Sequence, residues 1–137
     1  PRELHTDLAA EALDYKVYRE YRSDYMDKID AANACIDTEY FTVRVVSIKD
    51  PIRRNMIKYD SFAILTCTHG SCQVRIRSTH DEITLREGYS CLIPAAIADY
   101  DLIPVAGAVK VLESYIDNST QSSFRRMISQ FLHISGV

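Results

Sequence analysis

The sequence predicts a mainly β protein, a sandwich or jelly-roll barrel with a short helix before the strands and an amphipathic helix after them. Apolar and polar residues alternate along several short segments from Tyr40 onward, which is the pattern of strands buried on one face. Turn residues separate these segments at short intervals, and about eight strands at such spacing are typical of sandwiches and barrels. Near the C-terminus, an apolar stripe instead follows helical spacing.

Length, charge and cysteine content narrow the class of protein. A chain of 137 residues fits one domain with its own core, and no apolar run approaches the roughly 20 residues that a membrane-spanning helix needs. The 16 basic and 19 acidic side chains are scattered and give a net charge of -3, so neither nucleic acid nor a membrane is an expected partner. The first residues lack a secretory pattern, and the four cysteines are irregularly spaced. We therefore expect a cytoplasmic protein with reduced thiols.

Two segments precede the predicted strands. Apolar residues at helical spacing over 4–13 predict one short helix, with Thr6 as its N-cap. From 15 to 34 the chain is rich in tyrosine and charge and follows no period, which predicts an extended segment that lies over another surface.

Strand patterns fill the middle of the chain. The segment 62–67 is apolar at both parities, as expected of a strand covered on both faces, and His69, Gly70 and Ser71 supply the turn into the next strand. This hairpin is predicted to be the centre of the domain. The other strands are predicted at 41–45, 52–59, 73–77, 83–85, 90–93, 98–103 and 109–116.

An amphipathic helix is predicted over 119–134. Its apolar residues recur at i, i+3, i+4, i+7 and i+8, which places them on one face of a helix. That face either packs on the barrel or docks on another domain or subunit. The stripe consists of Phe124, Met127, Ile128, Phe131 and Leu132.

Glycines and a proline stand at a spacing that resembles the cupin barrel. Metal-binding cupins follow G-x5-H-x-H-x3-4-E-x6-G and then G-x5-P-x-G-x2-H-x3-N, in which the histidines and the glutamate hold one divalent metal. Here Gly88 to Pro94 gives G-x5-P, and Gly70 stands where the earlier motif ends. The predicted fold is therefore a cupin-like jelly-roll barrel.

None of the cupin ligand positions holds its usual residue. The glutamate position is Ala63 and the last histidine position is Asp99. Because a catalytic metal site needs about three converging protein ligands, we expect a metal-free barrel whose ligand positions are filled by apolar packing. The two positions of the histidine pair are Ile57 and Tyr59, or Met56 and Lys58 if the loop is one residue longer.

A second metal hypothesis rests on Cys67, His69 and Cys72, which straddle the predicted central hairpin. Cys67 and His69 share strand parity, so their side chains can point to the same side, and Cys72 lies across the turn. The favoured alternative is two buried thiols and a turn histidine, since free cysteine is usually packed as a small apolar residue.

The N-terminal residues resemble part of a known family. Arg2 to His5 spells R-E-L-H and precedes an alanine-rich helix; it resembles the R-E-L-H segment that short bacterial class I mannose-6-phosphate isomerases carry after their catalytic barrel. The stretches 40–42, 60–70 and 88–95 resemble the second, C-terminal cupin half of those enzymes. The resemblance extends from residue 1 to about residue 117.

The resemblance implies that the chain is the C-terminal structural cupin domain of an isomerase homologue and is not catalytic alone. The parent would be a zinc enzyme of carbohydrate metabolism that interconverts mannose 6-phosphate and fructose 6-phosphate. Its zinc ligands and sugar phosphate would belong to a missing N-terminal catalytic cupin half, so no cofactor is expected in this chain. Only Arg2, Glu3 and His5 would lie near the parent's active site, and Leu8 stands where many relatives have a lysine.

This hypothesis divides the chain into three parts. Residues 1–39 form a helix and an extended linker from the catalytic half, 40–117 a degenerate metal-free barrel, and 118–137 a C-terminal helix. The alternative is a stand-alone, metal-free cupin that binds a sugar and forms a homodimer through its C-terminal helix.

Overall fold

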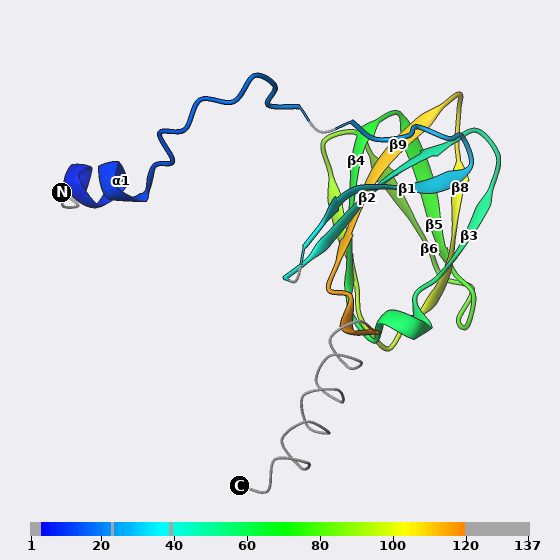
Figure 1. The fold of residues 1–137 in the computed structure, drawn as a ribbon. Helices are drawn as coiled ribbons and strands as arrows, with labels where there is room; N and C mark the ends of the chain where they lie inside the picture. Colours follow the sequence, from blue (N-terminus) through cyan, green and yellow to red (C-terminus); the bar gives the residue numbers. More distant parts are fainter. Residues whose placement is uncertain (1–3, 23, 39, 120–137) are drawn as a thin grey trace, which may run out of the picture.

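The structure, a computed structural model, describes residues 4–22, 24–38 and 40–119. In this part of the chain, nine strands form two antiparallel sheets (Figure 1). The five-stranded sheet has the order β1-β2-β9-β4-β7 and the four-stranded sheet the order β3-β8-β5-β6. The elements are α1 (Thr6–Ala12), β1 (Ala31–Asp37), β2 (Thr42–Ile48), β3 (Ile52–Asn55), η1 (Ile57–Tyr59), β4 (Ala63–His69), β5 (Ser71–Ile76), β6 (Glu82–Arg86), β7 (Ser90–Ile93), β8 (Asp99–Pro104) and β9 (Val109–Tyr115).

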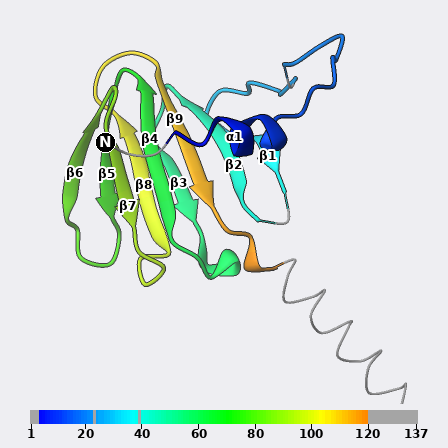
Figure 2. The same cartoon turned by 90° about the vertical axis from the view of Figure 1, so that its left-hand side faces the viewer.

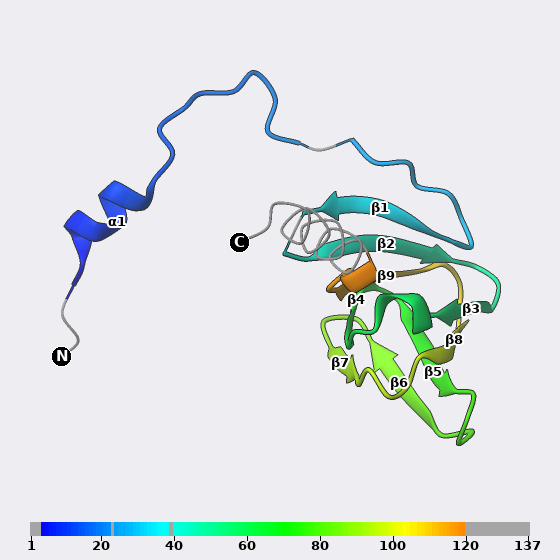
Figure 3. The same ribbon diagram turned by 60° about the horizontal axis from the view of Figure 1, so that its bottom comes forward.

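The core lies between the two sheets, because alternate residues of the central strands turn inward. Burial alternates at every position of β5 and of β9. Figure 3, a view from the bottom, shows β1, β2 and β9 on one side and β3, β5 and β8 on the other. A mainly β fold with one short N-terminal helix, as predicted, is therefore confirmed.

Gly70 lets the chain pass directly from one sheet to the other, since it links β4 to β5. Its φ of +77° is in the left-handed region, and a Cβ there would lie 3.0 Å from the carbonyl oxygen of Ala108. Both facts favour glycine. Gly88, in the turn between β6 and β7, also has a positive φ, of +81°.

β1 is a strand that the sequence pattern did not predict, and it lies inside the range 1–39. It pairs with β2, but a register shift between Ala34 and Ile36 interrupts the ladder. The segment before β1 is held against the sheet by Asp27, which accepts a hydrogen bond from Ser47 Oγ at 2.5 Å and pairs with Lys110 at 2.7 Å. Alanine, asparagine and cysteine in β1 carry little strand preference, so pairing with β2 decides the conformation here.

Three local predictions were wrong. The strand predicted at 52–59 ends at Asn55, and η1 follows, with Asp60 in the left-handed region at φ 46°. The segment 62–67 is covered on one face only, since Ile64 is 39% exposed. Thr6 is the first residue of α1, and His5 precedes it without a side-chain capping bond.

The helix predicted at 119–134 lies outside the described residues, apart from Ser119. α1 buries none of its residues and stands apart from the barrel in Figure 1. Among the described residues, no helix is long and apolar enough to cross a membrane.

Candidate functional site: a polar cluster inside the barrel

Polar side chains from both sheets meet at one end of the barrel interior. We call them the interior polar cluster. They come from both sheets and from the turn η1, and three of the six are tyrosines. The members are Arg44, Arg54, Tyr59, Tyr100, Glu113 and Tyr115.

Strand alternation brings these residues inward. On β9, Glu113 follows Val111 at the inward parity, and its partner across the ladder is Arg44 of β2. In the opposite sheet, Arg54 of β3 is paired with Tyr100 of β8. Two cross-strand pairs therefore face each other across the interior, one from each sheet.

Glu113 joins the two sheets at the centre of the cluster. Its side chain is 0% exposed, and that of Arg54 is 17% exposed. Arg54 donates from Nε to Oε1 at 2.9 Å and from Nη2 to Oε2 at 2.5 Å. Tyr100 donates its hydroxyl proton to Oε1 at 2.7 Å. All three donors reach one buried carboxylate, so its charge is paired in the fork geometry that a guanidinium favours.

The pKa values reflect this pairing. Burial by itself would lower the pKa of Arg54, but the hydrogen bonds and charge of Glu113 outweigh it, and the pKa is raised. Burial raises the pKa of Tyr100, and the negative charge of Glu113 raises it further. Tyr100 therefore stays protonated and acts as a donor to Glu113.

A second group of contacts extends the cluster along the five-stranded sheet. Arg44 Nε donates to the Tyr115 hydroxyl at 2.6 Å, and the ring of Tyr59 lies 4.5 Å from that of Tyr115, centroid to centroid. The hydrogen bond to Tyr115 raises the pKa of Arg44. Every buried side-chain nitrogen or oxygen among the described residues has a hydrogen-bond partner.

The donor set of this cluster does not fit a divalent metal. Zinc sites use several convergent Cys, His or carboxylate ligands, whereas this cluster offers one carboxylate already bonded to Arg54 and Tyr100. The Arg54 guanidinium would also repel a second cation beside Glu113. Among the described residues, no group of three His, Cys, Asp or Glu side chains could hold a metal ion.

The expected apolar filling of the cupin ligand positions was only partly right. Ala63 and Tyr59 are buried in the core. Asp99, however, bonds outward to Arg53, and its neighbour Tyr100 takes the inward place. Ile57, at the other position of the histidine pair, is 73% exposed. One end of the otherwise apolar interior is thus polar, and its two charged residues, Arg54 and Glu113, were not among the candidate residues.

The structure places the three residues of the cysteine hypothesis in two different environments. Cys67 and Cys72 are buried, whereas the His69 side chain is 68% exposed, with Nδ1 3.7 Å from Glu87 Oε2. Cys67 Sγ donates to the carbonyl oxygens of His69 and Gly70, both at 3.4 Å. Burial raises the pKa of Cys67 and raises that of Cys72 to about 12, so both thiols stay neutral near pH 7. Of the predicted active-site neighbours, His5 is exposed beside α1, and Arg2 and Glu3 lie outside the described residues.

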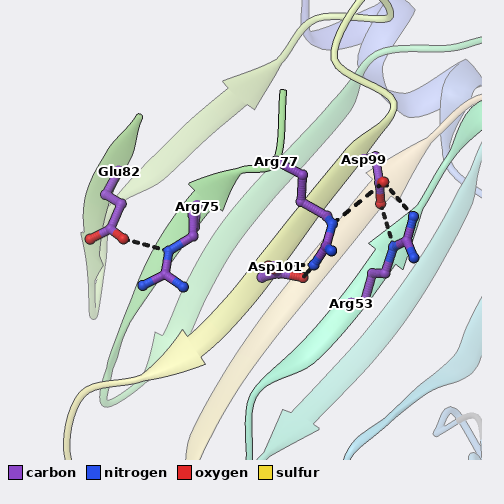
Figure 4. A network of polar contacts seen from close by, with 6 residues as sticks. All are labelled: Arg53, Arg75, Arg77, Glu82, Asp99 and Asp101. Atoms are coloured by element: carbon purple, nitrogen blue, oxygen red, sulfur yellow. Dashed lines mark hydrogen bonds and ion pairs between the residues drawn. The ribbon is translucent and has the colours of Figure 1, made fainter. Parts of the chain in front are cut away.

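A separate charged network covers the outer face of the four-stranded sheet (Figure 4). Arg53 donates to both oxygens of Asp99, at 2.8 and 2.6 Å. Arg77 bonds Asp101 at 2.9 and 3.0 Å and lies 3.7 Å from Asp99. The hydrogen bond from Arg53 lowers the pKa of Asp99. The outer charged network consists of Arg53, Arg75, Arg77, Glu82, Asp99 and Asp101.

Comparison with known proteins shows the family of this barrel. The model of the mannose-6-phosphate isomerase cupin domain matches residues 31–116, more than half of the chain. The chain belongs to this family. The match begins at the first residue of β1 and ends just after β9, so it includes both sheets. No curated protein matches the sequence.

Solved structures support the cupin fold. The mannose 6-phosphate isomerase of Bacillus subtilis superposes with a TM-score of 0.59 at 21% identity, over 83% of this chain and 35% of that one. A putative mannosephosphate isomerase from Archaeoglobus fulgidus gives 0.52 at 23% identity, over 60% of this chain and 25% of that one. A cupin-2 domain protein from Shewanella frigidimarina gives 0.52 at 13% identity, over 65% of this chain and 82% of that one. This cupin domain therefore spans about a quarter to a third of the two isomerases.

Proposed function

We propose that this chain is a structural, non-catalytic cupin module, the C-terminal cupin part of a class I mannose-6-phosphate isomerase homologue. The observation that carries the proposal is the Arg54–Glu113–Tyr100 contact inside the barrel. A guanidinium stands here beside the carboxylate, as a metal cation would in a catalytic cupin. The module holds its own buried charge balance and requires no ion to do so.

The interior cluster also suggests what the module contributes. Glu113 belongs to the five-stranded sheet, while Arg54 and Tyr100 belong to the other, so their hydrogen bonds connect the two walls of the barrel. A buried, fully bonded network of this kind fixes one arrangement of the sheets. Zinc, the sugar phosphate and the isomerisation would belong to the catalytic half, with Arg2, Glu3 and His5 as the residues of this chain nearest to it.

The N-terminal segment supports a partner of this kind. Large apolar side chains are exposed there, including Leu4 at 83%, Val17 at 90% and Tyr21 at 72%. Exposed apolar residues in such number mark surfaces that contact other protein parts. The proposed catalytic half would cover them, in agreement with the expectation that the tyrosine-rich stretch lies over another surface.

The proposal is tested with the purified chain, assayed for conversion of mannose 6-phosphate to fructose 6-phosphate with and without added zinc. We expect no turnover, and less than stoichiometric zinc by elemental analysis after desalting. Robust zinc-dependent turnover by the chain alone would contradict the proposal. A saturable thermal shift with mannose 6-phosphate, without turnover, would favour the stand-alone sugar-binding module instead.

A further inference from the structure

Exposed apolar side chains gather at one end of the outer face of the five-stranded sheet. They are between 39% and 61% exposed, although each belongs to a strand or directly precedes one. We call this group the apolar patch. It consists of Ile36, Phe41, Phe62, Ile64 and Leu92.

The strand register makes the patch continuous. Ile64 of β4 is paired with Leu92 of β7 on one side and with Ser114 of β9 on the other. Ser114 is paired with Val43 of β2, and Val43 with Ile36 of β1. One row therefore crosses all five strands on the outer face, with a single polar residue in it.

Phe41 and Phe62 extend this row at the same end of the sheet. They directly precede β2 and β4, and both of these strands run antiparallel to β9. Both phenylalanines therefore lie near the end of β9, at the outward parity. The other end of the same face is already covered, because Asp27 bonds Ser47 and Lys110 there.

The chain leaves the barrel beside the patch. β9 is the central strand of the five and lies between β2 and β4 (Figure 2). Its last residue, Tyr115, is paired with Ala63, the first of β4. Asp117 Oδ1 then accepts the backbone N–H of Ser119 at 3.0 Å, which is the N-cap geometry of a helix start. Asn118 Nδ2 donates to the carbonyl oxygen of Asp60 at 2.8 Å and ties this start to the turn after η1.

We propose that residues 120–137 pack on the apolar patch through Phe124, Met127, Ile128, Phe131 and Leu132. Eighteen residues as a helix would extend roughly 27 Å. The distance from β9, the central strand, to either edge strand is roughly 10 Å, so the segment is long enough to reach across the patch from where the chain leaves the sheet. Its stripe has the width of a face that packs on a sheet. Tethering next to the patch also gives this segment an effective concentration, roughly millimolar, that a separate partner must exceed.

The packing is tested by substitutions in the full-length chain. Leu92→Lys disrupts the patch and Phe131→Asp the stripe. We expect each to lower the midpoint of thermal unfolding by about 5 °C, the shift typical of losing a buried apolar contact in a domain of this size, and to increase binding of an apolar dye. The double variant should be no less stable than the worse single variant, because both remove the same contact.

Matched controls are available on other surfaces. Ile83→Lys changes an apolar residue that is 47% exposed on β6, outside the five-stranded sheet. Gln130→Asp changes the residue next to Phe131 in sequence, which does not belong to the apolar stripe. Both should leave the midpoint within about 1 °C. Additive effects of Leu92→Lys and Phe131→Asp, or shifts no larger than those of the controls, would overturn the proposal.

Two further measurements distinguish packing by residues 120–137 of the same chain from packing by a second copy. Methyl-to-aromatic nuclear Overhauser effects should connect Ile64 and Leu92 with Phe124 and Phe131, and they should vanish in the Phe131→Asp variant. In a mixture of differently labelled chains, contacts between chains would overturn the proposal and assign the patch to a second copy. A concentration-dependent dimer that Phe131→Asp abolishes would do the same.

Discussion

Arg53 and Arg54 are neighbours on β3, yet they pair with carboxylates in opposite environments. Arg53 points outward and pairs with Asp99, and these side chains are 55% and 31% exposed. Arg54 points inward to Glu113, which is fully buried. The two pairs have similar geometry, with two hydrogen bonds each. Solvent access alone should make them energetically different, because water and salt screen the outer pair and leave the inner one unscreened.

Breaking the inner pair should have the largest effect. Arg54→Met leaves the Glu113 carboxylate buried without its counter-charge, which costs about 3–5 kcal/mol of unfolding free energy. Urea unfolding at neutral pH measures the loss. Adding Glu113→Gln should recover part of it, since no unpaired charge then remains. A loss under about 1 kcal/mol for Arg54→Met would mean that the buried pair contributes no more to stability than an exposed pair does.

Removing the tyrosine donor should have an intermediate effect. Tyr100→Phe deletes the hydroxyl that bonds Glu113 Oε1 at 2.7 Å but leaves Arg54 in place. We expect a loss of about 1.5–3 kcal/mol, the contribution of one hydrogen bond to a charged group. The same urea titration checks this, and Tyr89→Phe, at an exposed tyrosine, is the control. Equal losses of stability in the two variants would mean that the hydrogen bond from Tyr100 to Glu113 makes no contribution of its own.

The outer pair should give the smallest effect, and its contribution should depend on pH. The hydrogen bond from Arg53 lowers the pKa of Asp99. The Asp99 carboxylate is therefore protonated at a higher pH in the unfolded chain than in the folded chain. The stabilisation is therefore present above the unfolded pKa of about 4 and is lost as the pH falls through the lower folded pKa.

Asp99→Asn should accordingly cost under about 1 kcal/mol at pH 7, and the difference from the original chain should shrink at acid pH and in 1 M salt. Unfolding midpoints measured from pH 7 down to pH 3 test this. If the stability difference between Asp99→Asn and the original chain grew toward acid pH, it would contradict the lowered pKa of Asp99.

The sequence already carries a signal for the two charged residues of the site. Glu113 follows Val109 and Val111 at the inward parity of its strand, and Arg54 follows Ile52 in the same way. A charge at an apolar position in each of two strands, with opposite signs, indicates an internal ion pair. The residues are 59 positions apart, and only the face-to-face packing of the two sheets makes them partners.

The strands themselves were predicted where alternation is strong and missed where it is weak. β5 and β9 follow the pattern of a half-buried strand throughout. β1 does not, and its strand conformation depends on pairing with β2. The opposite error, a strand continued from Asn55 to Tyr59, arose because apolar residues fit a 3-10 turn as well as a strand.

The sequence by itself determined the fold class, the turn glycines and the loss of the cupin ligands, because these depend on local periodicity and on residues at fixed spacing. The family resemblance rested on the same local features. Only the tertiary structure decided which polar side chains meet inside the barrel. Arg54 meets a buried carboxylate, and Asp99, one residue before the inward Tyr100, becomes a surface charge, only when both sheets are in place. Pairing across the interior and access of water are properties of the whole barrel, and no single segment contains them.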